Sequence, residues 1–452
     1  MLKRIVFVEL SILIILSFAQ APDTLWTKIY GGIGYDRCSS MQQTTDGGYI
    51  LGASTESYGN GDADFWLIKT NAFGDILWTK TYGGDSIDNA SAVQQTSDGG
   101  YIIAGHTQSF GTEDVQIYLV KTDSLGDSLW TKTFNVKAVS YCVRETFDGG
   151  YIIAGEIFYL GNDAYLVKTN SFGDTLWSKR YGSTFGGDFA WSVRQTSDSG
   201  YVIVGTTSLG AGSGDIWLLK TDENGDTLWA KTYGGGSWDY GISVDQTTDG
   251  GYIVTGRTNS FCVGYSDVWL LRTDSNGDTL WTKTFGGEGC EGGRFVQQTS
   301  DGGFIVAGWT DSYGAGWYDV WIIKTNSAGD TLWTQLYGGA GYDGCNGGGQ
   351  QTSDGGYVFP TETTSFGANR LSDIWLIRIE PDTFGIKEQQ IKLLTQDNIG
   401  VTIFSGPLLL PEGKNCRVFD ITGRVIAPEK IKPGIYFLEV DGDITQKVIK
   451  VK

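Results

Sequence analysis

The stretch Thr96-Ser97-Asp98-Gly99-Gly100-Tyr101-Ile102-Ile103-Ala104-Gly105 is one copy of a pattern that fills most of this 452-residue chain. A Leu-Trp pair repeats with it, and its tryptophans lie 52 residues apart except for a spacing of 47 between Trp130 and Trp177. The tripeptide Asp-Gly-Gly begins at Asp46, Asp98, Asp148, Asp249, Asp301 and Asp354, with Asp198-Ser199-Gly200 as a seventh, altered copy. Seven copies with a period near 50 residues predict the blades of a β-propeller.

Each unit contains the signals for four β-strands. In the second unit, apolar runs bounded by turn residues predict strands at 91–96, 101–107, 115–122 and 128–134. The Asp-Gly-Gly turn joins the first strand to the second, and turns such as 274–278, which contains Asn-Gly, join the third to the fourth. The runs are apolar without clean alternation, which is typical of sheets covered on both faces. Stacked blades provide that cover, so we expect no unit to be stable alone.

The two ends of the repeat region complement each other. Residues 23–32 match a fourth strand that has no earlier strands of its own. The seventh unit supplies strands through 375–377 and then lacks its own Leu-Trp segment. We therefore expect an all-β chain in which a seven-bladed β-propeller over residues 22–385 is closed by the N-terminal strand.

Composition narrows the functional classes. The net charge of −19 would repel nucleic-acid phosphates, so we expect no nucleic-acid partner. Aromatic residues make up 13% of the chain, which argues against disorder. A single histidine excludes zinc and copper centres that need several imidazoles, and we expect no metal and no cofactor.

The first 21 residues are predicted to be an export signal. Lys3 and Arg4 precede an apolar run over 5–18, which ends in the small-x-small site Ala19-Gln20-Ala21. The run is shorter than the roughly 20 residues that span a bilayer. We expect cleavage after Ala21, no transmembrane segment in the mature chain, and an extracellular or cell-surface location.

The repeated acidic turns are interpreted as structural. Residues 222–226 place oxygen side chains at alternate positions, but Thr227 and Tyr233 stand where an EF-type calcium loop needs Gly and Glu. Plain hairpin turns are therefore favoured. A further aspartate stands two residues before a third-strand aromatic in six units, where a loop-capping hydrogen bond is expected. These residues are Asp64, Asp163, Asp215, Asp267, Asp319 and Asp373.

One position varies chemically where the others repeat. Two residues after the Ile-Ala of the second strand or its equivalent, the units carry Ser54, His106, Glu156, Thr206, Arg257, Trp309 and Glu362. In a four-stranded blade this position shares a rim with the connection into the next blade. Aromatic side chains beside acids and an arginine are typical of recognition surfaces, including sugar-stacking platforms, although drift on an unselected rim is the alternative. The candidate ligand-binding rim comprises Tyr35, Asp36, His106, Glu156, Trp191, Trp238, Asp239, Arg257, Trp309, Tyr342, Asp343 and Glu362.

Six cysteines in an exported chain permit disulfides. Cys262 and Cys290 fall on one rim between adjacent blades and are the first candidate pair. Cys38 and Cys345 lie in equivalent segments of the first and seventh units and are the second. Cys142 and Cys416 are expected to be free and buried.

The tail at 386–452 carries a different β pattern. Three segments alternate apolar and polar residues around glycine turns, at 418–426, 433–440 and 447–452, and predict a small β-sandwich. They resemble the type A C-terminal sorting domain of type IX (Por) secretion cargo. The resemblance rests on Asp420, Gly423, Arg424, Gly434 and Tyr436, and it implies secretion machinery as a partner.

The repeats resemble the Asp-Gly-Gly-Tyr-Ile propellers common in exported prokaryotic proteins, which implies binding. We expect a non-catalytic binding or adhesion module at the cell surface, with an unknown protein or glycan ligand on the rim. One alternative is a glycan lyase or hydrolase that uses Asp239, Asp343 or Glu156, because paired carboxylates can cleave a glycosidic bond. His106 has no recognisable nucleophile beside it. A structural surface-layer component is a third interpretation.

Overall fold

The computed structural model describes two separate compact units, Met1–Asp382 and Thr383–Lys452. The described residues are 21–382, apart from 112–113, 159–160, 184–185 and 368–370, and 400–451, apart from 406–407, 409, 411–415, 421–423 and 441–442. The predicted export signal at 1–21 therefore lies, except for Ala21, outside the described residues.

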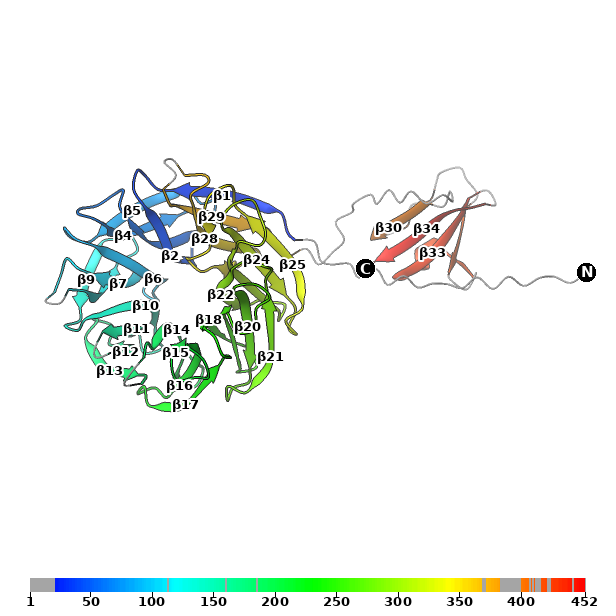
Figure 1. The fold of residues 1–452 in the computed structure, drawn as a ribbon. Coiled ribbons are helices and arrows are strands. Elements are labelled where there is room, and N and C mark those ends of the chain that lie inside the picture. Colours follow the sequence, from blue (N-terminus) through cyan, green and yellow to red (C-terminus); the bar gives the residue numbers. More distant parts are fainter. Residues whose placement is uncertain are drawn as a thin grey trace, which may run out of the picture. The chain divides into compact units, whose positions relative to one another are not determined.

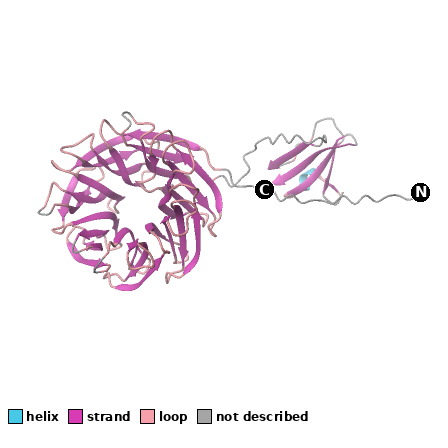
Figure 2. Ribbon diagram, in the orientation of Figure 1, coloured by secondary structure: helices cyan, strands magenta, loops and turns pink. Residues whose placement is uncertain are grey.

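The first unit consists of seven antiparallel sheets arranged around a common centre (Figures 1 and 2). The architecture is propeller-like, and the repeated turns separate the strands as predicted. The first three sheets contain β2 (Asp36–Gln43), β3 (Tyr49–Thr55), β4 (Asp64–Thr70) and β5 (Ile76–Tyr82); β6 (Asp88–Gln95), β7 (Tyr101–Thr107), β8 (Gln116–Thr122) and β9 (Ser128–Thr133); and β10 (Ala138–Glu145), β11 (Tyr151–Phe158), β12 (Asn162–Thr169) and β13 (Thr175–Tyr181).

The next three sheets follow the same order from the centre outward. They contain β14 (Phe189–Gln195), β15 (Tyr201–Thr207), β16 (Asp215–Thr221) and β17 (Thr227–Tyr233); β18 (Asp239–Gln246), β19 (Tyr252–Thr258), β20 (Asp267–Thr273) and β21 (Thr279–Phe285); and β22 (Glu291–Gln298), β23 (Phe304–Thr310), β24 (Asp319–Thr325) and β25 (Thr331–Tyr337).

The seventh sheet combines both ends of the repeat region. Its strands are β26 (Asp343–Gly344), β27 (Gln350–Gln351), β28 (Tyr357–Thr363), β29 (Asp373–Ile379) and β1 (Thr24–Tyr30). The N-terminal strand β1 pairs antiparallel with β29, with Tyr30 opposite Ile374 and Lys28 opposite Leu376. On the inner side, β2 of the first sheet contacts β27, β28 and β29.

The two sequence motifs meet at the contacts between sheets. In each unit the tryptophan of the Leu-Trp pair lies on the outermost strand, and its ring packs on the tyrosine or phenylalanine that follows the Gly-Gly turn of the next sheet. Ring centroids are 6.0 Å apart for Trp26 and Tyr49, and 5.9 Å apart for Trp78 and Tyr101. The same contact occurs in Trp130–Tyr151, Trp177–Tyr201, Trp229–Tyr252, Trp281–Phe304 and Trp333–Tyr357. Burial of these aromatic pairs explains why the motifs repeat together.

The Asp-Gly-Gly aspartate anchors a buried cation. Asp46 accepts hydrogen bonds from the Thr44 hydroxyl and the Gly48 N–H, and it pairs with the Lys69 ammonium at 2.9 Å. Burial opposes ionisation, but hydrogen bonds from Thr44, Lys69 and Gly48 outweigh it and lower the pKa of Asp46 to about 2. The equivalent pairs are Lys121–Asp98, Lys168–Asp148, Lys220–Asp198, Arg272–Asp249, Lys324–Asp301 and Arg378–Asp354. The motif is therefore a turn with a built-in ion pair.

The altered copy of the motif keeps the backbone conformation of the others. Ser199 has φ of +68°, in the left-handed region that favours glycine, and the equivalent Gly47 has φ of +83°. The turn geometry is thus common to the seven units, although the residue differs in one.

The second unit is a single mixed sheet in its described part, not the two facing sheets of the predicted sandwich. Its strands are β30 (Gly400–Ser405), β31 (Cys416–Asp420), β32 (Val425–Ile426), β33 (Gly434–Val440) and β34 (Asp443–Val451), with the 3-10 helix η1 (Pro428–Lys430). The sheet order is β30-β34-β33-β31-β32, and β30 runs parallel to β34. Alternation in the sequence predicted the strands, but alternation alone does not specify which strands share a sheet.

The residues of the predicted sorting motif surround β31 and β33. Asp420 ends β31, where its backbone pairs with Tyr436 of β33, and Gly434 begins β33. Arg424 is exposed and directly precedes β32. Gly423 lies outside the described residues. The buried centre of this unit contains Val418, Ile431, Leu438 and Val448.

All six cysteines are free thiols, so the two candidate disulfides are not present. The thiols of Cys38 and Cys345 are buried, and each donates a hydrogen bond at 3.3 Å to a nearby backbone carbonyl, that of Ser40 and that of Gly348. Cys262 likewise donates to the Gly264 carbonyl at 3.2 Å. The thiols are thus turned toward their own segments. Cys142 is buried and free as predicted, and Cys416 is free but only half-buried.

Candidate functional site

A row of β-bulges turns side chains toward the centre of the sheets. In each of the first six sheets, the pairing of the innermost strand with its neighbour skips one residue, as between Cys38 and Ser40. An unpaired bulge residue re-aims its side chain. The skipped residues are Ser39, Ser91, Tyr141, Trp191, Ile242 and Arg294.

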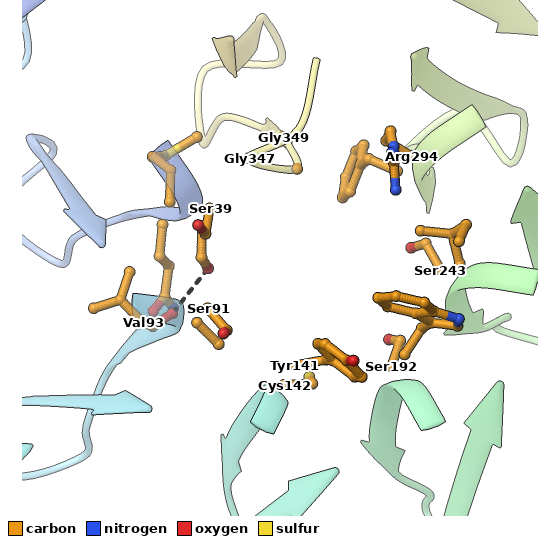
Figure 3. A pocket seen from close by; sticks show the side chains of 18 of the residues that line it. Ser39, Ser91, Val93, Tyr141, Cys142, Ser192, Ser243, Arg294, Gly347 and Gly349 are labelled. Atoms are coloured by element: carbon orange, nitrogen blue, oxygen red, sulfur yellow. Dashed lines mark hydrogen bonds between the residues drawn. The ribbon is translucent and has the colours of Figure 1, made fainter. Parts of the chain in front are cut away.

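These residues line a cavity of about 440 Å³ between the innermost strands, which we call the central cavity (Figure 3). The labelled side chains of Ser39, Tyr141 and Arg294 point into the same space in Figure 3. The lining is mainly polar, with serines, glutamines and arginines from β2, β6, β10, β14, β18 and β22. The stacked rings of Tyr141 and Trp191 form its aromatic part, with centroids 4.2 Å apart and planes inclined by 28°.

A second cavity of about 200 Å³ shares residues with the first and opens toward the predicted rim. We call it the mouth pocket, and its lining is Trp191, Tyr240, Ile242, Arg257, Gly293, Arg294 and Trp309. The Arg257 guanidinium lies 4.2 Å from the centroid of the Tyr240 ring, a cation–π distance. Tyr240 also stacks with Trp238, whose ring centroid is 5.6 Å away. The arrangement offers flat apolar faces beside two cations.

The local sequence makes room for these rings. A Cβ at position 292 would lie 2.7 Å from the Trp309 ring, so the absence of a side chain at Gly292 lets that ring lie against β22. Trp309 also meets Tyr318 edge to face, with centroids 4.9 Å apart. Glycine at position 292 thus fixes where the tryptophan forms the wall of the mouth pocket.

The predicted rim residues fall into several groups. Trp191, Arg257 and Trp309 come together in the mouth pocket, and Trp238 joins them through Tyr240. The variable second-strand position is equivalent in register across the sheets, because His106 pairs with Asn89 as Arg257 pairs with Tyr240. That register places the variable position at an equivalent point of each sheet, and its role in a ligand-binding rim stays a prediction.

Asp36, Asp239 and Asp343 are buried, so their placement on an exposed rim was wrong. Each begins an innermost strand and caps the loop before it. Asp239 accepts hydrogen bonds from the Ser260 hydroxyl at 2.6 Å and the Gly235 N–H at 2.9 Å. Asp343 accepts from Ser365 and Gly339 at 2.6 and 2.8 Å, and Asp36 accepts from Ser57 and Gly32 at the same distances. A short acid in the entry to a strand satisfies loop donors.

Two further acids are also buried. Glu156 accepts a hydrogen bond from the Tyr141 hydroxyl at 2.9 Å, and burial raises its pKa. Glu362 accepts from the Ser372 hydroxyl at 3.2 Å, and its pKa is raised by burial, against the charges of Arg37 and Arg294. Neither acid is an exposed rim group, because each lies under the loops and is held by neighbouring hydroxyls.

The remaining rim residues are dispersed. His106 is half-buried, its Nδ1 has no hydrogen-bond partner among the described residues, and burial lowers its pKa. Tyr35 is exposed and lies under the Arg37 guanidinium at 5.2 Å from its ring centroid. Tyr342 is half-buried and accepts a weak hydrogen bond from Asn346 at 3.4 Å.

The expected loop-capping role of the third-strand aspartates is confirmed where their bonds are seen. Asp64 accepts from the Asn60 N–H at 2.5 Å, and Asp319 accepts from the Ala315 N–H at 2.8 Å. Asp215 and Asp267 accept from Gly212 and Val263 at 3.2 and 3.1 Å. Asp163 instead pairs with Arg180.

Sequence reasoning missed most of the residues that line the central cavity and the mouth pocket. Tyr141, Tyr240 and Arg294 were not among the candidates, nor were Arg144 and Arg194. A comparison of units along the first strand, rather than the second, would have found them, since Ser39, Tyr141, Trp191 and Arg294 differ as strongly as the rim position does.

Within the described ranges, no group of three or more His, Cys, Asp or Glu side chains could hold a metal ion. Across the same ranges, no helix has both the length and the apolar character needed to cross a membrane.

Comparison with protein-family models and with curated proteins finds no match. Among solved structures, the chain is similar to a protein of unknown function from Dyadobacter fermentans DSM 18053, with 11% identity and a TM-score of 0.44 over 80% of this chain and 100% of that one. It is also similar to BBS1N in complex with ARL6DN, with 11% identity and a TM-score of 0.44 over 80% and 97%. A third similar structure is Sqt1 from Chaetomium thermophilum, with 11% identity and a TM-score of 0.41 over 76% of this chain and 88% of that one. Likenesses this distant say nothing about the ligand.

Proposed function

We propose that the first unit is a closed seven-bladed β-propeller that acts as a non-catalytic binding module. The pairing of β1 with β29 supports closure. The observation that carries binding is the mouth pocket, where Trp191, Trp309 and Tyr240 provide flat faces beside Arg257 and Arg294. Aromatic faces with a few convergent polar groups are the usual composition of a small-ligand or glycan site.

Replacement of Trp309 by alanine tests this proposal, together with Trp238→Ala at the edge of the stack. Loss of the stacking faces should weaken binding of a glycan or protein found by glycan array or pull-down by up to about tenfold, because aromatic contacts contribute about 0.5–1.5 kcal/mol. The melting temperature of Trp238→Ala should barely change, since that ring is 45% exposed.

Trp317→Ala is the matched control, because this ring is 78% exposed and lies outside the mouth pocket. It should leave binding unchanged. Equal loss of binding in all three variants, or no ligand on the array and in the pull-down, would contradict the proposed site.

We further propose that the chain is exported and that the C-terminal unit directs it across the outer membrane to the surface. The support is the signal-like sequence at 1–21 and the resemblance of 386–452 to a sorting domain. Deletion of 386–452 should leave the protein in the periplasm of its producing cell, as measured by fractionation and antibody access to intact cells. Undiminished surface display would contradict this role.

A further inference from the structure

A belt of glutamines links neighbouring sheets at one level of the central cavity. Each glutamine side-chain Oε1 accepts a hydrogen bond from a backbone N–H of the next sheet. The Gln95 N–H lies 2.7 Å from the Gln42 Oε1. The same backbone-to-side-chain distance is 2.8 Å for the pairs Glu145–Gln94, Gln351–Gln297 and Gln43–Gln350. Glutamine is therefore the residue that the fold itself favours at this level.

Three consecutive sheets depart from that rule. Arg144, Arg194 and Asp245 occupy the equivalent register position, opposite Ile152, Val202 and Ile253. Asp245 still accepts a hydrogen bond from the Gln298 backbone. An arginine has no acceptor atom, so Arg144 and Arg194 cannot make the belt's hydrogen bond. Arg144 instead donates to the backbone carbonyl of Val143, its own neighbour, at 2.9 Å, so neither arginine replaces the link between sheets.

One carboxylate, that of Asp245, lies near both arginines, but it forms an ion pair only with Arg194. The Asp245 Oδ1 is 3.7 Å from the Arg194 Nε, which is an ion pair but not a hydrogen bond. The Nε atoms of both Arg144 and Arg194 are buried and have no hydrogen-bond partner among the described residues. Burial, and then the charge of Arg194, lower the pKa of Arg144. Two close guanidiniums with one acid leave excess positive charge in a chain whose net charge is −19.

Rings and hydroxyls stand beside these arginines on the same strands. Tyr141 and Trp191 precede Arg144 and Arg194 by three residues each, and their stacked rings also line the central cavity. The Trp191 Nε1 is buried without a hydrogen-bond partner in the described part of the chain. Hydroxyls come from Ser39, Ser91, Ser192 and Ser243.

We propose that Arg144 and Arg194 bind the carboxylate of an acidic sugar, a uronic acid residue, whose ring lies against the stacked Tyr141–Trp191 pair. This inference rests on the proposed binding function and names its ligand class. Guanidinium forks match the geometry of a carboxylate, and an aromatic face with hydroxyls and amides suits the carbon faces and hydroxyls of a sugar ring. The cavity of about 440 Å³ lies within the range of small-ligand sites.

The test is calorimetric titration of the full chain with sodium glucuronate, sodium galacturonate, glucose, galactose, the methyl ester of glucuronate and inorganic phosphate. The uronates should bind at least about tenfold more tightly than the neutral sugars and the ester, because charge-assisted hydrogen bonds are lost with the charge. The ester tests the carboxylate on the unaltered protein. Phosphate should bind more weakly than the uronates because it makes no ring contact.

Arg144→Gln with Arg194→Gln should abolish the preference for uronates. These substitutions restore the residue used by the other sheets but leave the buried Asp245 without a counter-charge. The melting temperature is therefore compared in the triple variant that adds Asp245→Gln, where it should stay or rise. Lys80→Gln with Lys137→Gln is the control, because it removes two charges from exposed ion pairs. It should leave the preference intact.

Several outcomes would overturn the inference. These are no uronate binding by the unaltered chain, equal affinity for glucuronate and its ester, phosphate binding as tightly as the uronates, or a lowered melting temperature in the triple glutamine variant. A glycan or protein that still binds through Trp309 would then leave the proposed binding function standing.

Discussion

A chain that begins at residue 34 should lose at least about 4 kcal/mol of stability relative to a chain that begins at residue 22, and it should aggregate on mild heating. The shortened chain lacks β1, so β29 becomes an open edge of the seventh sheet. The loss also uncovers one face of the seventh sheet and the neighbouring first sheet. In the intact chain Trp26 packs on Tyr49, and the Tyr30 hydroxyl donates to the Gly74 carbonyl at 2.6 Å.

Two further experiments show whether the loss of stability comes from β1 itself. Truncation after residue 382 removes a longer segment, yet it should leave the melting temperature of the first unit unchanged because that unit has its own core. A synthetic peptide of residues 22–33 added to the shortened chain should restore part of the lost stability by mass action. Equal melting temperatures for the chains beginning at 22 and 34 would show that β1 is dispensable.

Asp301→Asn should destabilise the first unit by about 3 kcal/mol. The Lys324 side chain is fully buried, and its ammonium lies 2.8 Å from Asp301, of which 26% of the side chain is exposed. Asparagine can keep the turn hydrogen bonds but leaves a buried cation without a counter-charge. Asp330→Asn is the control because its pair with Lys283 is exposed, and it should change little. Urea unfolding at pH 7 measures both variants.

The difference in the free energy of unfolding between Asp301→Asn and the unaltered chain should become smaller at acidic pH. Hydrogen bonds from Lys324, Thr299 and Gly303 outweigh burial and lower the pKa of Asp301 below its ordinary value of 3.8. A carboxyl whose pKa is lowered by folding contributes stability that is present above its unfolded pKa and lost as pH falls through its folded pKa. The gap should therefore be full above the ordinary pKa of 3.8 and narrow as the pH falls below it. A gap that stays constant would contradict the assigned ion pair.

Much of the fold could be predicted because the repeat is regular. The Leu-Trp and Gly-Gly-Tyr motifs mark the two partners of one contact, so their spacing predicted the strands. The missing outer strand after residue 377 also predicted that β1 would pair with β29. The tail gave no such internal comparison, and its strand pairing could not be derived from alternation.

The site was only partly predictable. Comparison of units located Arg257 and Trp309, because a position that geometry leaves free varies in chemistry. The burial of Asp239 could not be anticipated, since an acid at a strand entry has the same sequence signal whether it caps a loop or faces solvent. The bulges hid Tyr141 and Arg294, because one unpaired residue reverses which side chains face inward.

The pairing of β1 with β29 also has a kinetic consequence. It joins the N-terminal strand of the repeat region to a strand that ends at Ile379, so the ends must meet across almost the whole repeat region. Such long-range closure is slow, and it cannot begin before the last repeat has been synthesised. A partly synthesised chain therefore remains an open array with two unpaired sheet edges, and a chaperone that covers those edges would control when β1 pairs with β29.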